Sequence, residues 1–177
     1  MKNNNIITVD GPSASGKGSL AKALAKELNF LLLDSGLLYR AYSYCFDQGQ
    51  NHSTAKSLFS NLRIDSIDHE MHVFENNKDI TSILRHENIA KSASQLSSLK
   101  ETRDNLITFQ RDLASDSGLV ADGRDMGTVV FPDAGTKIFL VADAEVRAKR
   151  RFLELQNADQ GVNMRDLIED IRLRDEA

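Results

Sequence analysis

Residues 6–19 read Ile-Ile-Thr-Val-Asp-Gly-Pro-Ser-Ala-Ser-Gly-Lys-Gly-Ser, a short apolar run that opens into a glycine-rich loop. Three of them, Gly11, Gly16 and Lys17, have the spacing of a phosphate-binding loop, in which glycines let backbone N–H groups crowd around an anion. Leucines at every fourth position from 20 to 28 predict a helix whose positive N-terminal end faces that anion. Strand, loop and helix together predict a nucleotide-phosphate site, and the alternative is a glycine-rich turn that binds nothing. The predicted phosphate-binding residues are Gly11, Pro12, Ser13, Ala14, Ser15, Gly16, Lys17, Gly18 and Ser19.

The loop departs from the strict phosphate-loop pattern at one position. Gly18 stands where a Ser or Thr hydroxyl normally binds Mg²⁺, so that the first hydroxyl after the lysine belongs to Ser19. A Gly-Lys-Gly-Ser ending resembles the small-molecule and nucleotide kinases rather than the GTPases or motor ATPases.

The bulk composition predicts one globular domain of 177 residues, with 41% hydrophobic and 27% charged residues. A net charge of −4 argues against general nucleic-acid binding, which needs a basic surface. Cys45 is the only cysteine, which excludes a disulfide framework and favours a reduced, cytoplasmic setting. We expect no signal peptide and no membrane span, and the absence of a long apolar stripe favours a monomer.

The apolar segments alternate between predicted strands and predicted helices. This order predicts an α/β fold with a parallel sheet sandwiched by helices. One stretch, residues 63–81, breaks the rhythm with short alternating runs and an Asn76-Asn77 turn, and it predicts a small antiparallel insert. The predicted strands are 6–9, 30–33, 119–121 and 138–141, and the predicted helices are 19–28, 37–46, 87–97 and 100–115.

Polar residues follow the predicted strands, and parallel sheets bind ligands beyond the carboxyl ends of their strands. Asp34 ends the second strand and Asp122 ends the third, although Asp122 could be a simple turn residue. We expect Mg²⁺ to be held by Ser19, helped through water by Asp34 or Asp122. Arg40 follows the second strand, and on its own it would be read as a solvated helix charge. The helix after Val141 carries a further basic group, Arg147, Lys149, Arg150 and Arg151.

A distinctive string, DGRDMGTVVFP at residues 122–132, carries a family resemblance. Together with the loop, Leu33-Asp34-Ser35-Gly36, Tyr39-Arg40 and Ala93-Ser94-Gln95, it resembles the bacterial cytidylate (CMP) kinases along the whole chain. That resemblance implies transfer of the γ-phosphoryl group of ATP to CMP or dCMP with Mg²⁺. It also implies one kinase domain over residues 1–177, an acceptor-binding region near 36–100 that contains the β insert, and a lid beginning near 157.

The resemblance also assigns roles to individual residues. It implies that Ser35 and Arg40 contact the acceptor, that Arg124 contacts the acceptor phosphate, and that Ser94, Arg103 and Asp125 read the cytosine. A carboxylate suits cytosine because the base offers an exocyclic amine donor, whereas uracil would oppose it with a carbonyl oxygen. Without the family, Ser94 and Arg103 would be read as solvated helix residues. The implied catalytic residues are Lys17, Arg40, Arg124 and Arg174.

Several alternatives stay open at this point. The family continues beyond residue 177, so we expect the end of the lid, the last strand and the C-terminal helix to be missing. The chain could instead be another phosphate-loop kinase, or a non-catalytic nucleotide-binding module if it natively ends at Ala177. His69 and His72 lie in a predicted strand on opposite faces, which argues against a metal site. One of Arg147, Arg150 and Arg151 is expected near the adenine or the phosphates of ATP, and the alternative is a solvated helix face.

Overall fold

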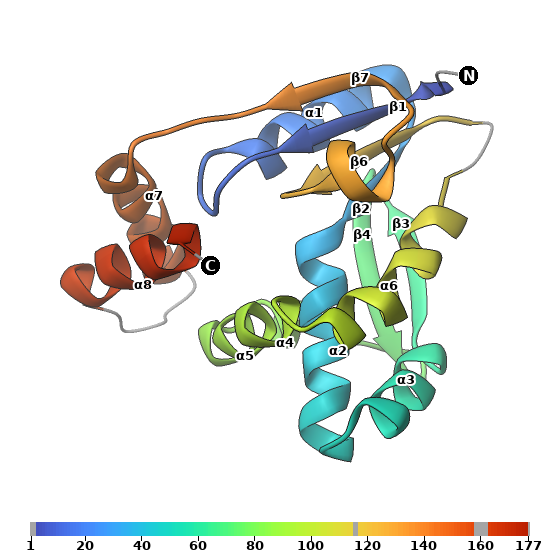
Figure 1. Cartoon of the computed structure of the whole chain (residues 1–177), viewed down its shortest axis with the longest axis horizontal. Coiled ribbons are helices and arrows are strands. Elements are labelled where there is room, and N and C mark those ends of the chain that lie inside the picture. The colour runs from blue at the N-terminus through green and yellow to red at the C-terminus, as the bar shows by residue number, and fades with distance from the viewer. Residues whose placement is uncertain (1–2, 115–116, 158–162, 177) are drawn as a thin grey trace.

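The computed structural model describes residues 3–114, 117–157 and 163–176. Its centre is a four-stranded parallel sheet in the order β2-β6-β1-β7 (Figure 1). This sheet confirms the predicted α/β fold. Its strands are β1 (Asn3–Asp10), β2 (Leu31–Asp34), β6 (Leu119–Gly123) and β7 (Ala134–Phe139).

Both faces of the sheet are covered, because strands β1, β2 and β6 carry apolar residues on both sides. Helix α1 (Lys17–Leu28) buries Ala21 and Ala25 against Val9 and Val120 on one face. Residues Ile6, Leu33, Leu119 and Ala121 point to the opposite face, where they join the larger core. That core is shared with α2 (Ser35–Gly49) and α6 (Lys100–Asp112).

Several predicted boundaries were wrong, including both ends of β7 and of α2. The strand predicted at 138–141 is β7, which begins at Ala134 and ends at Phe139. It is an edge strand with exposed Thr136 and Lys137, and these polar residues made the start of the strand look like a loop. The strand also ends earlier than predicted, and Val141 beyond it is 75% exposed. The helix predicted at 37–46 is α2, which starts at Ser35 and runs on through Gly49 before Gln50 turns left-handed with φ 52°.

The insert predicted at 63–81 is a three-stranded antiparallel sheet in the order β3-β4-β5. Asn76 and Asn77 form the predicted turn with φ values of 49° and 65°, and a similar turn at Asp68 and His69 was not predicted. His69 therefore lies in a turn and not in a strand as predicted. The three strands are β3 (Arg63–Ile67), β4 (Glu70–Glu75) and β5 (Lys78–Asp79).

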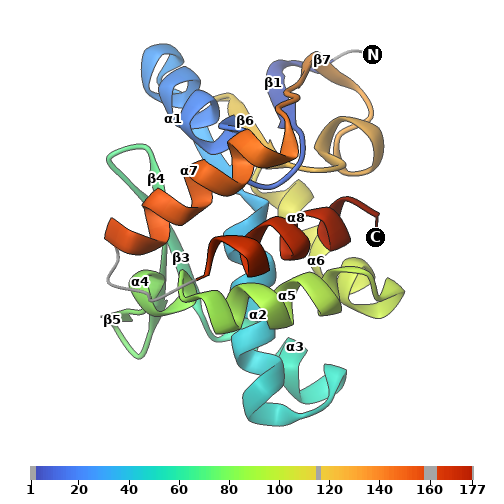
Figure 2. The same ribbon diagram turned by 90° about the vertical axis from the view of Figure 1, so that its left-hand side faces the viewer.

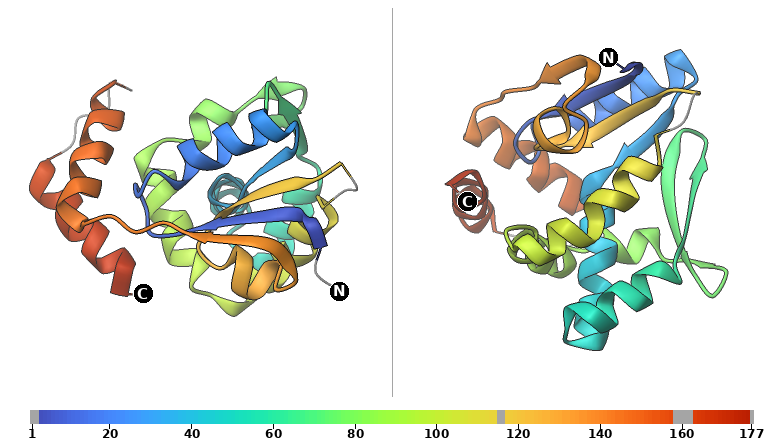
Figure 3. Two further views of the ribbon diagram at one scale, coloured as in Figure 1. Left: turned by 90° about the horizontal axis from the view of Figure 1, so that it is seen from above. Right: turned by 45° about the vertical axis from the view of Figure 1, so that its right-hand side comes forward.

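The remaining helices surround the insert and the open end of the sheet. Helix α5 matches its prediction, whereas α3 was not predicted and α6 stops before the expected residue 115. Figures 2 and 3 show α7 and α8 side by side, beyond the end of the sheet where β7 finishes. Within the described ranges no helix is long and apolar enough to span a bilayer. These elements are α3 (His52–Ser60), α4 (Thr81–Leu84), α5 (Glu87–Ser97), the π-helical turn η1 (Met126–Val130), α7 (Ala144–Asn157) and α8 (Met164–Glu176).

Candidate active site

The glycine-rich loop joins β1 to α1 and has the backbone of an anion-binding turn. Gly16 adopts φ 98° at the N-cap of α1, which favours glycine and turns the first amides of the helix toward the loop. A Cβ on Gly11 would lie 2.3 Å from the Leu140 carbonyl oxygen, so only glycine lets the end of β7 approach here. Lys17 Nζ donates to the Pro12 carbonyl at 3.3 Å, which folds the ammonium back over the loop.

Two arginines of α7 hold the outside of this loop. Arg147 Nη1 donates to the Ser13 carbonyl at 3.3 Å, and Arg150 Nη1 donates to the Ser15 carbonyl at 2.8 Å. These bonds occupy loop carbonyls and bring two positive charges beside the place where an anion would bind. Helix α7, which follows β7, therefore supports the loop through these two hydrogen bonds. Its basic side is not merely a solvated helix face, which was the alternative.

Asp122, at the end of β6, faces the start of α1. Its Oδ2 lies 3.3 Å from where a Cβ on Gly18 would stand, so a side chain at position 18 would crowd this carboxylate. Glycine at position 18 thus leaves room for this carboxylate. Burial raises the pKa of Asp122 to about 7, opposed by the charge of Lys17 and reinforced by those of Asp34 and Asp10.

The donor atoms around Asp122 suit a hard cation such as Mg²⁺. Asp122 is 9% exposed, and its Oδ1 has no hydrogen-bond partner within the described part of the chain. Asp34 is less available, because its Oδ1 accepts the Leu37 N–H at 2.9 Å as the N-cap of α2, and its Oδ2 faces Arg85 at 3.7 Å. Among the described residues no three His, Cys, Asp or Glu side chains gather into a metal site. A cation here would thus be shared with its ligand's oxygens and with water.

One cleft of about 550 Å³ connects the loop with the predicted acceptor residues. Gly11, Pro12 and Ser15 belong to the loop but are not part of its described lining. Arg174 lies in α8, and its side chain is outside those that the structure describes. The predicted residues that line the cleft are Ser13, Ala14, Gly16, Lys17, Gly18, Ser19, Asp34, Ser35, Arg40, Ser94, Arg103, Asp122, Arg124 and Asp125.

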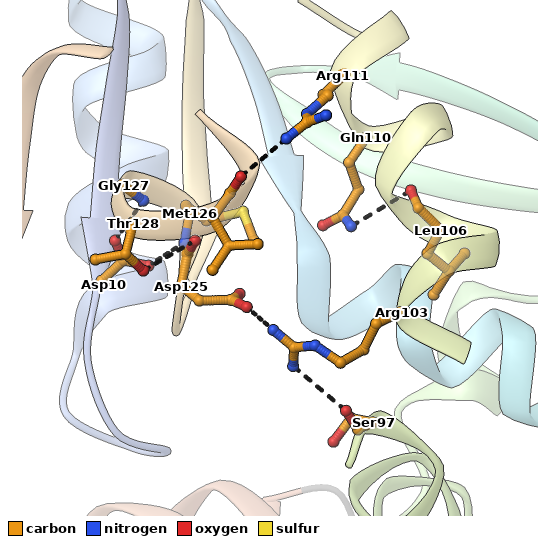
Figure 4. A network of polar contacts seen from close by, with 11 residues as sticks. Asp10, Ser97, Arg103, Leu106, Gln110, Arg111, Asp125, Met126, Gly127 and Thr128 are labelled. Atoms are coloured by element: carbon orange, nitrogen blue, oxygen red, sulfur yellow. Dashed lines mark hydrogen bonds and ion pairs between the residues drawn. The ribbon is translucent and has the colours of Figure 1, made fainter. Parts of the chain in front are cut away.

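At the far end of the cleft, Arg103 of α6 forms an ion pair with Asp125 (Figure 4). Arg103 also donates to the Ser97 carbonyl at 3.4 Å, which directs the guanidinium across the gap between α5 and η1. Side-chain exposures of 41% and 23% for Arg103 and Asp125 leave the pair accessible from the cleft. The pair offers a donor set beside an acceptor set, which is what a heterocyclic base edge can pair with.

Two sequence comparisons agree at this point. The model of a family described as "Cytidylate kinase" matches residues 7–177. Cytidylate kinases from Pseudomonas fluorescens strains Pf-5 and SBW25 are each 45% identical to the chain, and that from Pseudomonas syringae pv. tomato is 44% identical. Each alignment covers 97% of this chain and 78% of the relative. This chain belongs to the cytidylate kinase family.

Between the two ends of the cleft of this cytidylate kinase family member lies a cluster of arginines from separate elements. Arg40 of α2 donates to the Leu84 carbonyl at 3.2 Å, and Arg151 of α7 pairs with Glu87 at 2.5 Å. Burial, and then the charge of Arg151, lower the pKa of Arg40 to about 10, while Asp34 and Glu87 act in the opposite direction. Such crowding of like charges in a cleft is favourable once an anion binds there.

Several residues of this cleft could not be selected from their sequence context. Arg85 follows a short apolar helix and Glu87 begins α5, and nothing in their local pattern distinguishes them from surface charges. Lys22 and Glu70, which form an ion pair at the edge of the cleft, come from α1 and β4 and meet only through the fold. The three arginines of α7 contact two different parts of the cleft. Arg147 and Arg150 bond to the phosphate loop, and Arg151 pairs with Glu87 on the predicted acceptor side.

Proposed function

We propose that this chain transfers the γ-phosphoryl group of ATP to CMP or dCMP, giving ADP and CDP or dCDP. The observation that carries the proposal is that one cleft has a phosphate loop at one end and the Arg103–Asp125 pair at the other. A phosphoryl group passing between two nucleotides needs both held in line with their negative charges neutralised. The arginines between the two ends supply that neutralisation.

On the donor side, the loop amides and Lys17 hold the phosphates of ATP. Residues Ser19 and Asp122 would hold Mg²⁺, with Asp34 acting through water. When bound, the ion neutralises charge on the donor phosphate oxygens. Arg150 and Arg147 keep the loop carbonyls turned outward, so that the loop amides stay directed at the anion.

On the acceptor side, Asp125 accepts the exocyclic amine of cytosine, and Arg103 and Ser94 donate to the acceptor edge of the ring. Without a nucleotide, Arg103 and Asp125 pair with each other. Cytosine inserts between them and replaces this ion pair with a hydrogen bond to each. Ser35 contacts the acceptor nucleotide, and its phosphate meets Arg40 and Arg124. Arg151, held by Glu87, adds charge at the same point.

The division of labour along the chain follows from this arrangement. Residues 36–100 form the acceptor-binding region, with the β3-β4-β5 sheet as its insert, and the lid begins near residue 157. Arg174 approaches the transferred phosphoryl group from the lid, as its position in the family pattern implies. The nucleotides, and not a nucleic acid or a membrane, are the partners, and the protein acts as a monomer.

A coupled ADP-release assay tests the proposal with CMP, dCMP, UMP and AMP as acceptors and MgATP as donor. We expect CMP and dCMP to be used at least about a hundredfold better than UMP, because uracil leaves the Asp125 carboxylate unpaired. Lys17→Met, which removes the loop charge, is the background control. A preference for UMP or AMP would indicate another nucleotide kinase, and calorimetric binding of CMP without turnover would indicate a non-catalytic module.

A further inference from the structure

The turn that carries Asp125 into the cleft is held by a residue of the central sheet. Asp10, the last residue of β1, accepts the N–H groups of Met126 and Gly127, each at 2.8 Å (Figure 4). Asp125 is the residue immediately before these two and is the N-cap of η1. A carboxylate that takes two consecutive backbone amides fixes both the position and the orientation of the turn.

The contact between β1 and η1 leaves little space. Asp10 is 6% exposed, and a Cβ on Gly127 would lie 2.6 Å from Thr8 Oγ1 and 3.2 Å from Asp10 Oδ2. Glycine at 127 therefore allows the close approach on which the two hydrogen bonds depend. The next residue after Asp10 is Gly11, so the same short segment also begins the phosphate loop.

A second residue holds the other end of the turn. Arg111 of α6 donates through Nε to the Val130 carbonyl and through Nη2 to the Val129 carbonyl, each at 3.0 Å. Two turns earlier on the same helix, Arg103 pairs with Asp125 (Figure 4). A single rigid helix thus carries one member of the base-facing pair and also fixes the turn that carries the other member.

We propose that Asp10 and Arg111 are positioning residues that set the choice of acceptor base by fixing Asp125 relative to Arg103. Within the described lining of the cleft neither residue appears, so both act through η1 and not by contact with a nucleotide. The proposal rests on the function proposed above. Base discrimination depends on buried hydrogen bonds whose geometry tolerates little displacement, so a loosened turn costs selectivity before it costs phosphate binding.

The test compares Asp10→Asn and Arg111→Met with the unaltered chain in the same assay, with CMP and UMP as acceptors. Asn can accept only one of the two amides, and Met keeps the packing of the Arg111 stem without its donors. We expect the ratio of kcat/KM for CMP to that for UMP to fall at least about tenfold in each variant, with the KM for ATP within about twofold. Lys56→Met, an exposed charge removal on α3, is the matched control.

The ratio separates positioning from mere stability, because a smaller folded fraction lowers both activities equally and leaves the ratio unchanged. An unchanged ratio in either folded variant overturns the proposal. Arg111→Lys, which restores one donor, should recover part of the ratio, and it decides the matter if Asp10→Asn does not fold. If the unaltered chain does not use CMP, the proposed function itself has failed, which is a different result.

Discussion

Replacement of Asp122 by asparagine should stabilise the free protein at neutral pH while abolishing most of its activity. The carboxylate is buried, and its pKa is raised from 3.8 to about 7. That interval corresponds to about 4 kcal/mol at ~1.4 kcal/mol per pH unit, as an upper bound. Allowing for partial access of water, we expect a gain of about 2–4 kcal/mol for Asp122→Asn at pH 8.

The sign of the pH dependence follows from the direction of the shift. Because the folded pKa of Asp122 lies above the unfolded value, the folded state is favoured at low pH. Stability is then lost as the pH rises from about 4 to about 7, and it changes little above that. The asparagine side chain does not ionise, so the variant does not lose this stability. Its gain in the free energy of unfolding over the unaltered chain should be near zero at pH 4 and complete at pH 8. A gain of that size corresponds to a rise in Tm of roughly 5–15 °C for a domain of this size.

The assay is thermal unfolding at pH 4, 6 and 8 in buffer that contains a chelator, so that no divalent cation reaches the carboxylate. Asp133→Asn, at an exposed position, is the matched control and should show no such pH-dependent gain. Loss of stability in Asp122→Asn at pH 8, or an equal change at pH 4 and pH 8, would refute the reasoning. The same variant should lose at least about tenfold in kcat, because the ligand for the cation has lost its charge.

Three substitutions test the phosphate loop, the Arg103–Asp125 pair and the packing of η1 against β1. Lys17→Met should reduce kcat by at least about a hundredfold with a change in Tm below about 3 °C, since Lys17 begins α1 and its ammonium reaches back over the loop instead of into the core. Comparison of steady-state rates with melting curves checks this. Arg103→Gln should raise the KM for CMP by about tenfold or more and leave the KM for ATP within about twofold; equal increases in both would mean that the Arg103–Asp125 pair is structural. Gly127→Ala should cost about 2 kcal/mol or more in a urea denaturation experiment, because its methyl group would meet Thr8, and a change below about 0.5 kcal/mol would contradict the close packing seen there.

The sequence was most informative where structure depends on local chemistry. The phosphate loop needs glycines and a lysine at fixed spacing, and the β insert needs its Asn76-Asn77 turn, so both could be predicted. Helix α5, with a strong apolar stripe, was predicted with its observed bounds. The edge strand β7 was predicted too short, because one side of it faces solvent and its polar residues resemble a loop.

The site was predictable only as a set of separate residues. Arg103 and Asp125 were both expected at the base, but they lie 22 residues apart and their ion pair arises only when α6 packs beside η1. The support that Asp10 gives to Gly127 spans 117 residues and has no local signature. Arg85 was missed for the same reason, since its partner Asp34 comes from a different element.

A crystal structure of the protein with CMP bound is the most direct measurement of the central claim. The account predicts that the cytosine amine donates to the Asp125 carboxylate, that the direct Arg103–Asp125 ion pair opens around the ring, and that the acceptor phosphate reaches Arg40 and Arg124. The account is contradicted if CMP binds with its base away from Asp125, or if Arg103 and Asp125 remain paired while the base lies elsewhere in the cleft.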